Sequence, residues 1–106
     1  MMKFTMTDHA LERMPRLMRC ITEVGVGDVV LTAQDNLHTG GRSRWLTSTG
    51  LILIVAEKDN ALITGYMGTM SQVVAIYKAN GIDNIPSYMR KLVKKNMEKH
   101  KDLLKN

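Results

Sequence analysis

The middle of the chain holds its most continuous apolar run, LILIVA at Leu51–Ala56, with turn-forming polar residues on both sides. Unbroken apolarity of this length is typical of a central strand that is covered on both faces. Strand-like segments at residues 45–49 and 61–67 flank it, separated from it by Thr49–Gly50 and Asp59–Asn60, which favour tight turns. The pattern predicts that these segments form an antiparallel meander.

The residues before this meander carry helical signals. Residues 3–6 are compatible with a short strand, after which Thr7 or Asp8 can cap a helix that runs through Met14. Pro15 predicts a kink or a stop near Met14, because its ring clashes with the carbonyl group of the preceding helical turn.

A second helical segment is predicted at residues 23–33, with Thr22 as its cap. Gly25 and Gly27 make this segment a weak helix former, because glycine costs about 1 kcal/mol relative to alanine inside a helix. Residues 34–44 show no apolar periodicity and are predicted to form a loop.

Helical signals return after the meander. Ser71 can cap a helix that runs to residue 79 and ends at Asn80–Gly81. Pro86 suits the first turn of a last helix, whose buried face is predicted from a three- and four-residue spacing of Met89, Leu92, Val93, Met97 and His100. The order of helices, antiparallel sheet and helices predicts an α+β domain.

Length and composition indicate one folded domain that spans residues 1–106. Apolar residues make up 44% of the chain, which is enough to form a core. The LILIVA run is too short to cross a bilayer, and the first ten residues lack the pattern of a signal peptide. Cys20 is the only cysteine, so no internal disulfide is expected. These features favour a cytoplasmic protein that does not insert into membranes.

The net charge of +5 is concentrated at one end of the chain. Residues 86–106 hold seven lysines and arginines against two acidic residues, whereas basic and acidic residues balance elsewhere. This asymmetry favours a polyanionic partner such as RNA, and the candidate contacts are Arg90, Lys91, Lys94, Lys95 and Lys99. The same charges are also compatible with a solvated helix face that binds nothing.

His9 and Arg13 are the first candidates for chemistry. They are four residues apart in a predicted helix, so they lie on one face of it. RNA cleavage through its own 2′-hydroxyl needs a base, an acid and positive charge at phosphorus, but no metal. Histidine is mostly neutral at pH 7 and can act as the base, while an arginine binds phosphate. Surface ion pairing with Glu12 is the simpler interpretation.

Four further residues are candidates for the same site. Arg42 and Arg44, in the predicted loop, can supply positive charge, although one of them can instead stack on Trp45. Thr64 and Tyr66 alternate along the last predicted strand, so they share a face and can present a hydroxyl and a phenol. Both are also good strand formers without any function.

Several kinds of site are not predicted. No cysteine or histidine pair has metal-ligand spacing, and the chain has neither a Walker loop nor a dinucleotide-binding glycine motif. The paired carboxylates of two-metal nucleases are missing as well. We therefore expect no metal site and no cofactor.

The stretch FTMTDHALERM, at residues 4–14, resembles the opening of BrnT-like proteins of the RelE superfamily of toxin ribonucleases, where a strand leads into an H-A-x-x-R-M helix. The similarity continues through ITEV, RSRW, LILIVA and ALITGY, and spans residues 4–66. It implies N-terminal helices packed on an antiparallel sheet, metal-independent RNA cleavage and a protein antitoxin as a possible partner. His9 and Arg13 match the helix motif. The other matches are the pre-strand arginine (Arg42 or Arg44) and Thr64 at the strand end.

On this resemblance residues 4–67 form a RelE-like core, and residues 71–106 form a basic helical extension. Two other functions stay open. The chain can be a non-enzymatic phage or mobile-element protein that binds nucleic acid, or inhibits an RNA-handling complex, through its last helix. It can also be an interaction domain that forms homo-oligomers through that helix.

Overall fold

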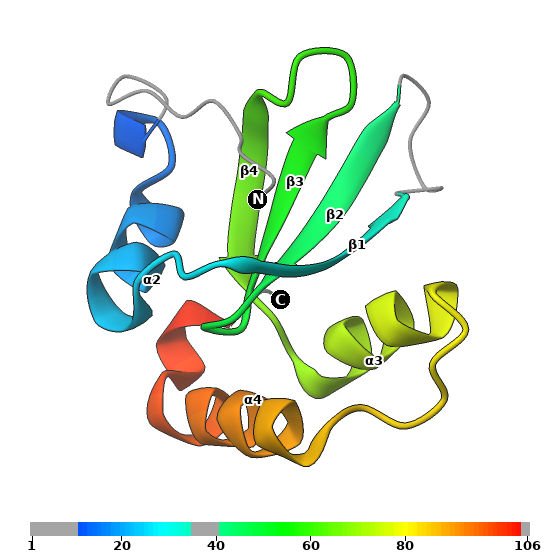
Figure 1. The fold of residues 1–106 in the computed structure, drawn as a ribbon. Coiled ribbons are helices and arrows are strands. Elements are labelled where there is room, and N and C mark those ends of the chain that lie inside the picture. The colour runs from blue at the N-terminus through cyan, green and yellow to red at the C-terminus, as the bar shows by residue number, and fades with distance from the viewer. Residues whose placement is uncertain (1–10, 35–40, 105–106) are drawn as a thin grey trace.

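The computed structural model describes residues 11–34 and 41–104 and shows an α+β fold, as predicted (Figure 1). Its centre is an antiparallel sheet in the order β1-β2-β3-β4, made of Val29–Gln34, Arg42–Thr47, Leu51–Ala56 and Leu62–Met67. Helix α2 (Pro15–Val24) precedes the sheet; α3 (Met70–Ala79), α4 (Ser87–Lys99) and the 3₁₀ turn η1 (Lys101–Leu103) follow it. None of the helices in these residues is long and apolar enough to span a membrane.

The predicted meander is confirmed, with β3 as an interior strand. Leu51 through Val55 are all buried, and the turn between β2 and β3 contains Gly50 with a φ of 90°. The turn between β3 and β4 contains Asn60 with a φ of 55°. Strand β2 starts at Arg42 rather than at residue 45.

The helix predicted at residues 23–33 is wrong. Helix α2 ends at Val24, because Gly25 and Gly27 adopt φ values of 77° and 71° that end it. The chain then extends into β1, which pairs with β2. The loop predicted at residues 34–44 is shorter in the structure, because β1 ends at Gln34 and β2 starts at Arg42. Of that loop, residues 35–40 lie outside the described residues, as do the strand predicted at residues 3–6 and its Thr7 or Asp8 cap.

Helix α2 starts where the proline requires it. Met14 has non-helical backbone angles, and Pro15 occupies the first turn of α2, which confirms the predicted interruption at Met14. Thr22 lies inside α2 and donates a hydrogen bond to the carbonyl of Met18, so it is not a cap. Helix α3 is capped by Thr69 in a reciprocal arrangement with Gln72, rather than by Ser71.

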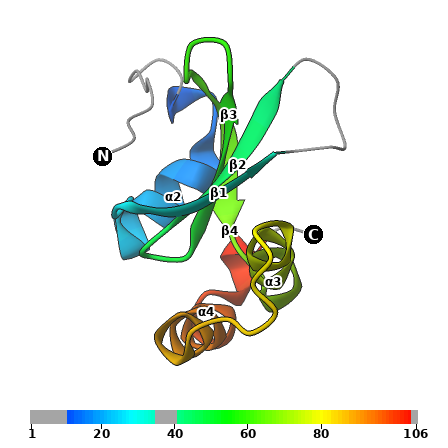
Figure 2. The same cartoon turned by 45° about the vertical axis from the view of Figure 1, so that its right-hand side comes forward.

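Each face of the sheet is covered by different helices (Figure 2). Leu53 of β3 packs with Leu17 and Cys20 of α2, whereas its neighbour Ile52 packs on the opposite face with Val73 and other residues of α3 and α4. Helix α2 therefore covers one face together with Leu103 of η1, and α3 and α4 cover the other. The predicted order of helices, antiparallel sheet and helices is thus confirmed for the described residues.

Candidate functional site

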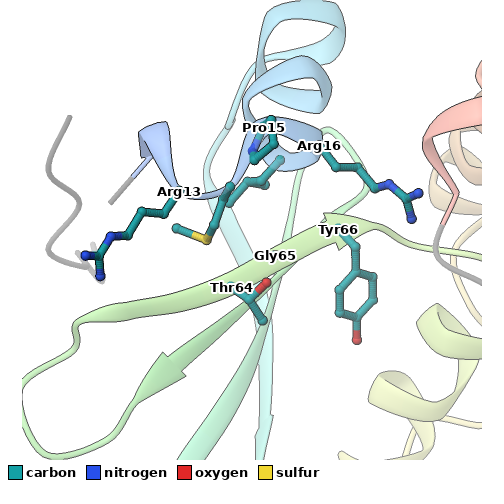
Figure 3. A pocket seen from close by; sticks show the side chains of 8 residues that line it. Arg13, Pro15, Arg16, Thr64, Gly65 and Tyr66 are labelled. Atoms are coloured by element: carbon teal, nitrogen blue, oxygen red, sulfur yellow. The ribbon is translucent and has the colours of Figure 1, made fainter. Parts of the chain in front are cut away.

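A pocket of about 310 Å³ lies between the start of α2 and the edge strand β4 (Figure 3). We call it the β4 pocket; its lining residues are Arg13, Met14, Pro15, Arg16, Leu17, Thr64, Gly65 and Tyr66. Two segments about fifty positions apart in the chain thus meet at one place.

The close approach of α2 to β4 depends on Gly65. A Cβ atom at this position would lie 2.8 Å from Cδ2 of Leu53 and 3.0 Å from Cδ1 of Leu17. Leu17 is buried and reaches the β4 backbone only because no side chain stands there. The contact between Leu17 and β4 forms the apolar part of the pocket lining, and the other lining residues include two arginines and two residues with hydroxyl groups.

Three of the predicted catalytic residues line the β4 pocket. Arg13 lines it together with Thr64 and Tyr66, but the side chains of Thr64 and Tyr66 point to the face of β4 opposite to α2, away from Arg13 (Figure 3). The strand register agrees, because Thr64 pairs with Ile54 and Tyr66 with Ile52, which share a face. A register shift next to Ile54 places Ile63 in the core on this face too, so the simple alternation predicted for β4 is not kept.

Arg16 is a pocket residue that sequence reasoning did not select. It is exposed and lines the β4 pocket, and Figure 3 shows Arg13 and Arg16 extending in opposite directions from it. Within residues 11–34 and 41–104, the one ion pair joins Arg19 to Asp102, so neither Arg13 nor Arg16 is neutralised by a described carboxylate. Arg16 directly follows Pro15, the first residue of α2, and this position was the sequence signal that could have identified Arg16.

Arg42 and Arg44 do not line the β4 pocket. Arg44 pairs with Ile54, which pairs with Thr64, so Arg44 and Thr64 share a face of the sheet with β3 between them. Neighbouring strands are about 4.8 Å apart, which separates the two backbones by about 10 Å. The Nη2 atom of Arg44 donates to the carbonyl of Gln34 at 3.2 Å, on the side away from β4. His9 lies outside the described residues.

The basic residues predicted on the last helix all belong to α4. Its buried side is made of Met89, Val93 and Asn96, with Leu92 and Met97 half-buried. The side exposed to solvent carries Arg90, Lys91, Lys94, Lys95 and Lys99. None of these five forms an ion pair with a residue of the described part. The predicted amphipathic helix is therefore confirmed, and its polar face is strongly cationic. Pro86 and His100, predicted inside this helix, lie at its two caps.

Thiol and metal chemistry find no support in the residues that the structure describes. Cys20 is fully buried, and burial raises the pKa of its thiol above the ordinary value, so a reactive thiolate is disfavoured. No three histidine, cysteine or acidic residues of the described part lie close enough together to hold a metal ion.

Comparison with known proteins does not place the chain in a family. No protein-family model, no curated protein sequence and no solved structure matches it. The functional argument therefore rests on the geometry and chemistry of the β4 pocket and of α4.

Proposed function

We propose that the protein is a toxin-type endoribonuclease that cleaves RNA without a metal or other cofactor. The observation that carries the proposal is the β4 pocket itself, whose lining combines Arg13 and Arg16 with Thr64 and Tyr66 of the edge strand. The sequence resemblance to RelE-type toxins selected Arg13 and Thr64, and the alternation of β4 selected Tyr66. All three line this pocket, Arg13 from the residues just before α2 and the other two from β4. A helix that precedes an antiparallel meander also fits the RelE-like core that this resemblance implies.

In the proposed reaction the attacking group belongs to the substrate. His9 removes the proton of a 2′-hydroxyl, whose oxygen attacks the adjacent phosphorus while the bond to the 5′ oxygen breaks. The leaving oxygen takes a proton from an acid, for which Tyr66 is the candidate, with its side chain across the edge of β4 from Arg13. The products are a 2′,3′-cyclic phosphate and a free 5′-hydroxyl, and no water is consumed.

The other residues bind the phosphate and the flanking RNA. Arg13 and Arg16 are exposed cations at the β4 pocket and stabilise charge that develops on the phosphoryl oxygens. The Thr64 hydroxyl contacts the RNA from the other face of β4, across the strand edge. Arg42 and Arg44, on the same sheet face but two strands away, are assigned to neighbouring phosphates rather than to the reacting one. We place this activity in the cytoplasm, with a protein antitoxin as a partner.

The test is digestion of total RNA in EDTA, followed by mapping of the RNA ends. Wild-type protein should leave cyclic phosphates. His9→Ala should lose about 10²–10⁴-fold in rate, as expected for a general base. Arg13→Ala should lose a comparable factor, whereas the control Lys58→Ala removes an exposed cation that does not line the β4 pocket and should cleave normally. Full activity of both His9→Ala and Arg13→Ala would exclude this site.

A second candidate function is nucleic-acid binding without catalysis, as in a phage or mobile-element protein. The unneutralised cationic face of α4 favours it, because lysines and arginines along one helix face suit a phosphate backbone. This function predicts RNA binding by wild-type protein that leaves the RNA intact in the same digestion.

A further inference from the structure

A second pocket, of about 270 Å³, lies where the end of α2, the turn between β2 and β3, and α4 meet. We call it the turn pocket. It is lined by Glu23, Val24, Ser48, Thr49, Leu92, Lys95, Asn96, Lys99 and His100. No part of the reaction proposed above uses it.

The donors around the turn pocket suit a phosphate group. Lys95 and Lys99 are one helical turn apart, so both ammonium groups reach the same side of α4. The Oγ atom of Ser48 accepts the amide of Asp28 at 2.9 Å, which leaves its own proton available to a ligand. Glu23 is the one carboxylate in the lining, so the two lysines outweigh it.

The backbone of the turn pocket is held in place by hydrogen bonds. The buried side-chain amide of Asn96 donates to the carbonyl of Thr49 at 3.0 Å. The hydroxyl of Thr49 lies 2.7 Å from the carbonyl of Gly25, to which it donates. These bonds tie α4, the β2–β3 turn and the α2–β1 connection together. The backbone that carries the donors of the pocket is therefore preorganised.

Helix α2 connects the two pockets. The β4 pocket is lined by its first residues and the turn pocket by its last, and ten helical residues span about 15 Å. Arg16, Arg19 and Glu23 are exposed on one face of this helix. Arg19 reaches Asp102 of η1 at 2.6 Å, which places this face beside the segment that follows Lys99 and His100. Figure 1 shows α2, η1 and α4 in this succession.

We propose that the turn pocket binds a backbone phosphate of the same RNA strand whose scissile phosphate occupies the β4 pocket. The strand crosses the exposed arginine face of α2 between the two pockets. The inference rests on the proposed function and adds a feature to it, because the protein then distinguishes long single-stranded substrates from short ones. The turn pocket acts on affinity, not on the chemical step.

The test uses 2′-O-methyl RNA, which lacks the attacking hydroxyl and cannot be cleaved by the proposed route. Binding of a dinucleotide and of a decanucleotide is measured for wild type, for Lys95→Gln/Lys99→Gln and for the control Lys58→Gln/Lys78→Gln. All four lysines are exposed, and the control pair lines neither pocket. The pocket variant should weaken only decanucleotide binding and lower its salt slope by about 0.7–1.4. Glu23→Gln should tighten decanucleotide binding, because it removes the opposing carboxylate.

Two results would overturn the proposal. One is an equal loss of decanucleotide affinity in the pocket variant and the control variant, which would mean that the loss arises from net charge alone. The other is an equal loss of dinucleotide and decanucleotide affinity in the pocket variant. Failure of the ribonuclease proposal is seen separately, as intact unmodified RNA after incubation with wild-type protein in EDTA.

Discussion

The side-chain amide of Asn96, in the last turn of α4, donates a hydrogen bond to the main-chain carbonyl of Thr49 in the β2–β3 turn, at 3.0 Å. Asn96 is only 4% exposed although its helix is strongly charged. Gly50 lies against the same amide, since a Cβ atom there would lie 2.7 Å from Nδ2 of Asn96. This contact attaches the cationic helix to the sheet and sets its position beside α2.

Asn96→Ala should therefore destabilise the protein by about 1–3 kcal/mol, because the carbonyl of the half-buried Thr49 loses its donor. Urea unfolding measures the change in the free energy of unfolding. Glu98→Ala, at an exposed position of the same helix, is the matched control and should lie within about 0.5 kcal/mol of wild type. Equal stabilities of the two variants would mean that the Asn96 bond contributes nothing.

Gly65→Ala should also destabilise the protein, for a steric reason. The added methyl group meets Leu53 at 2.8 Å and Leu17 at 3.0 Å, so α2 must move away from β4. Overpacking of this kind costs about 1–3 kcal/mol. If the β4 pocket is the RNA site, cleavage should fall by more than the unfolded fraction explains. Thermal unfolding and activity measured on the same preparation check this, and a variant with unchanged stability would contradict the packing argument.

Tyr77 should make stability depend on alkaline pH. Burial, with the nearby Tyr88 as a smaller cause, raises the pKa of Tyr77 from 10.0 to about 12. Between these values the unfolded chain has released the phenolic proton and the native chain has kept it. The free energy of unfolding should thus be fully retained below pH 10 and fall as the pH rises towards 12.

Urea unfolding at several pH values measures this dependence in wild type and in Tyr77→Phe. The phenylalanine variant lacks the titrating group, so its stability should fall less steeply over the same interval. An identical pH slope in the two proteins would show that Tyr77 does not carry the effect.

The exposed face of α4 should govern the salt dependence of RNA binding. Replacing Lys91, Lys94 and Lys95 with glutamine should weaken RNA binding. It should also reduce the slope of log affinity against log salt concentration by up to about the contribution of three phosphate contacts. Affinity is measured at several salt concentrations by fluorescence anisotropy. A slope equal to that of wild type would mean that this helix face is only solvated surface.

Local patterns in the sequence determined most of the secondary structure. The LILIVA run predicted an interior strand because such a strand needs apolar side chains on both faces, and Pro15 predicted a helix boundary because its ring excludes a preceding helical turn. The same local rules failed at residues 29–34. There the valines of β1 form a strand because β2 offers a hydrogen-bonding edge, which local sequence does not reveal.

The composition of the candidate site was decided only by the tertiary structure. Arg13, Thr64 and Tyr66 were selected from separate segments, and they line one pocket because Leu17 packs against β4 at a position that has no side chain, Gly65. The strand register also places the Thr64 and Tyr66 side chains on the face of β4 opposite to Leu17. Arg44 was selected by the same reasoning, yet its side chain is held by a carbonyl of β1. Such outcomes depend on strand register and on contacts between segments distant in the chain. A local pattern predicts which residues are polar, whereas packing decides which of them meet.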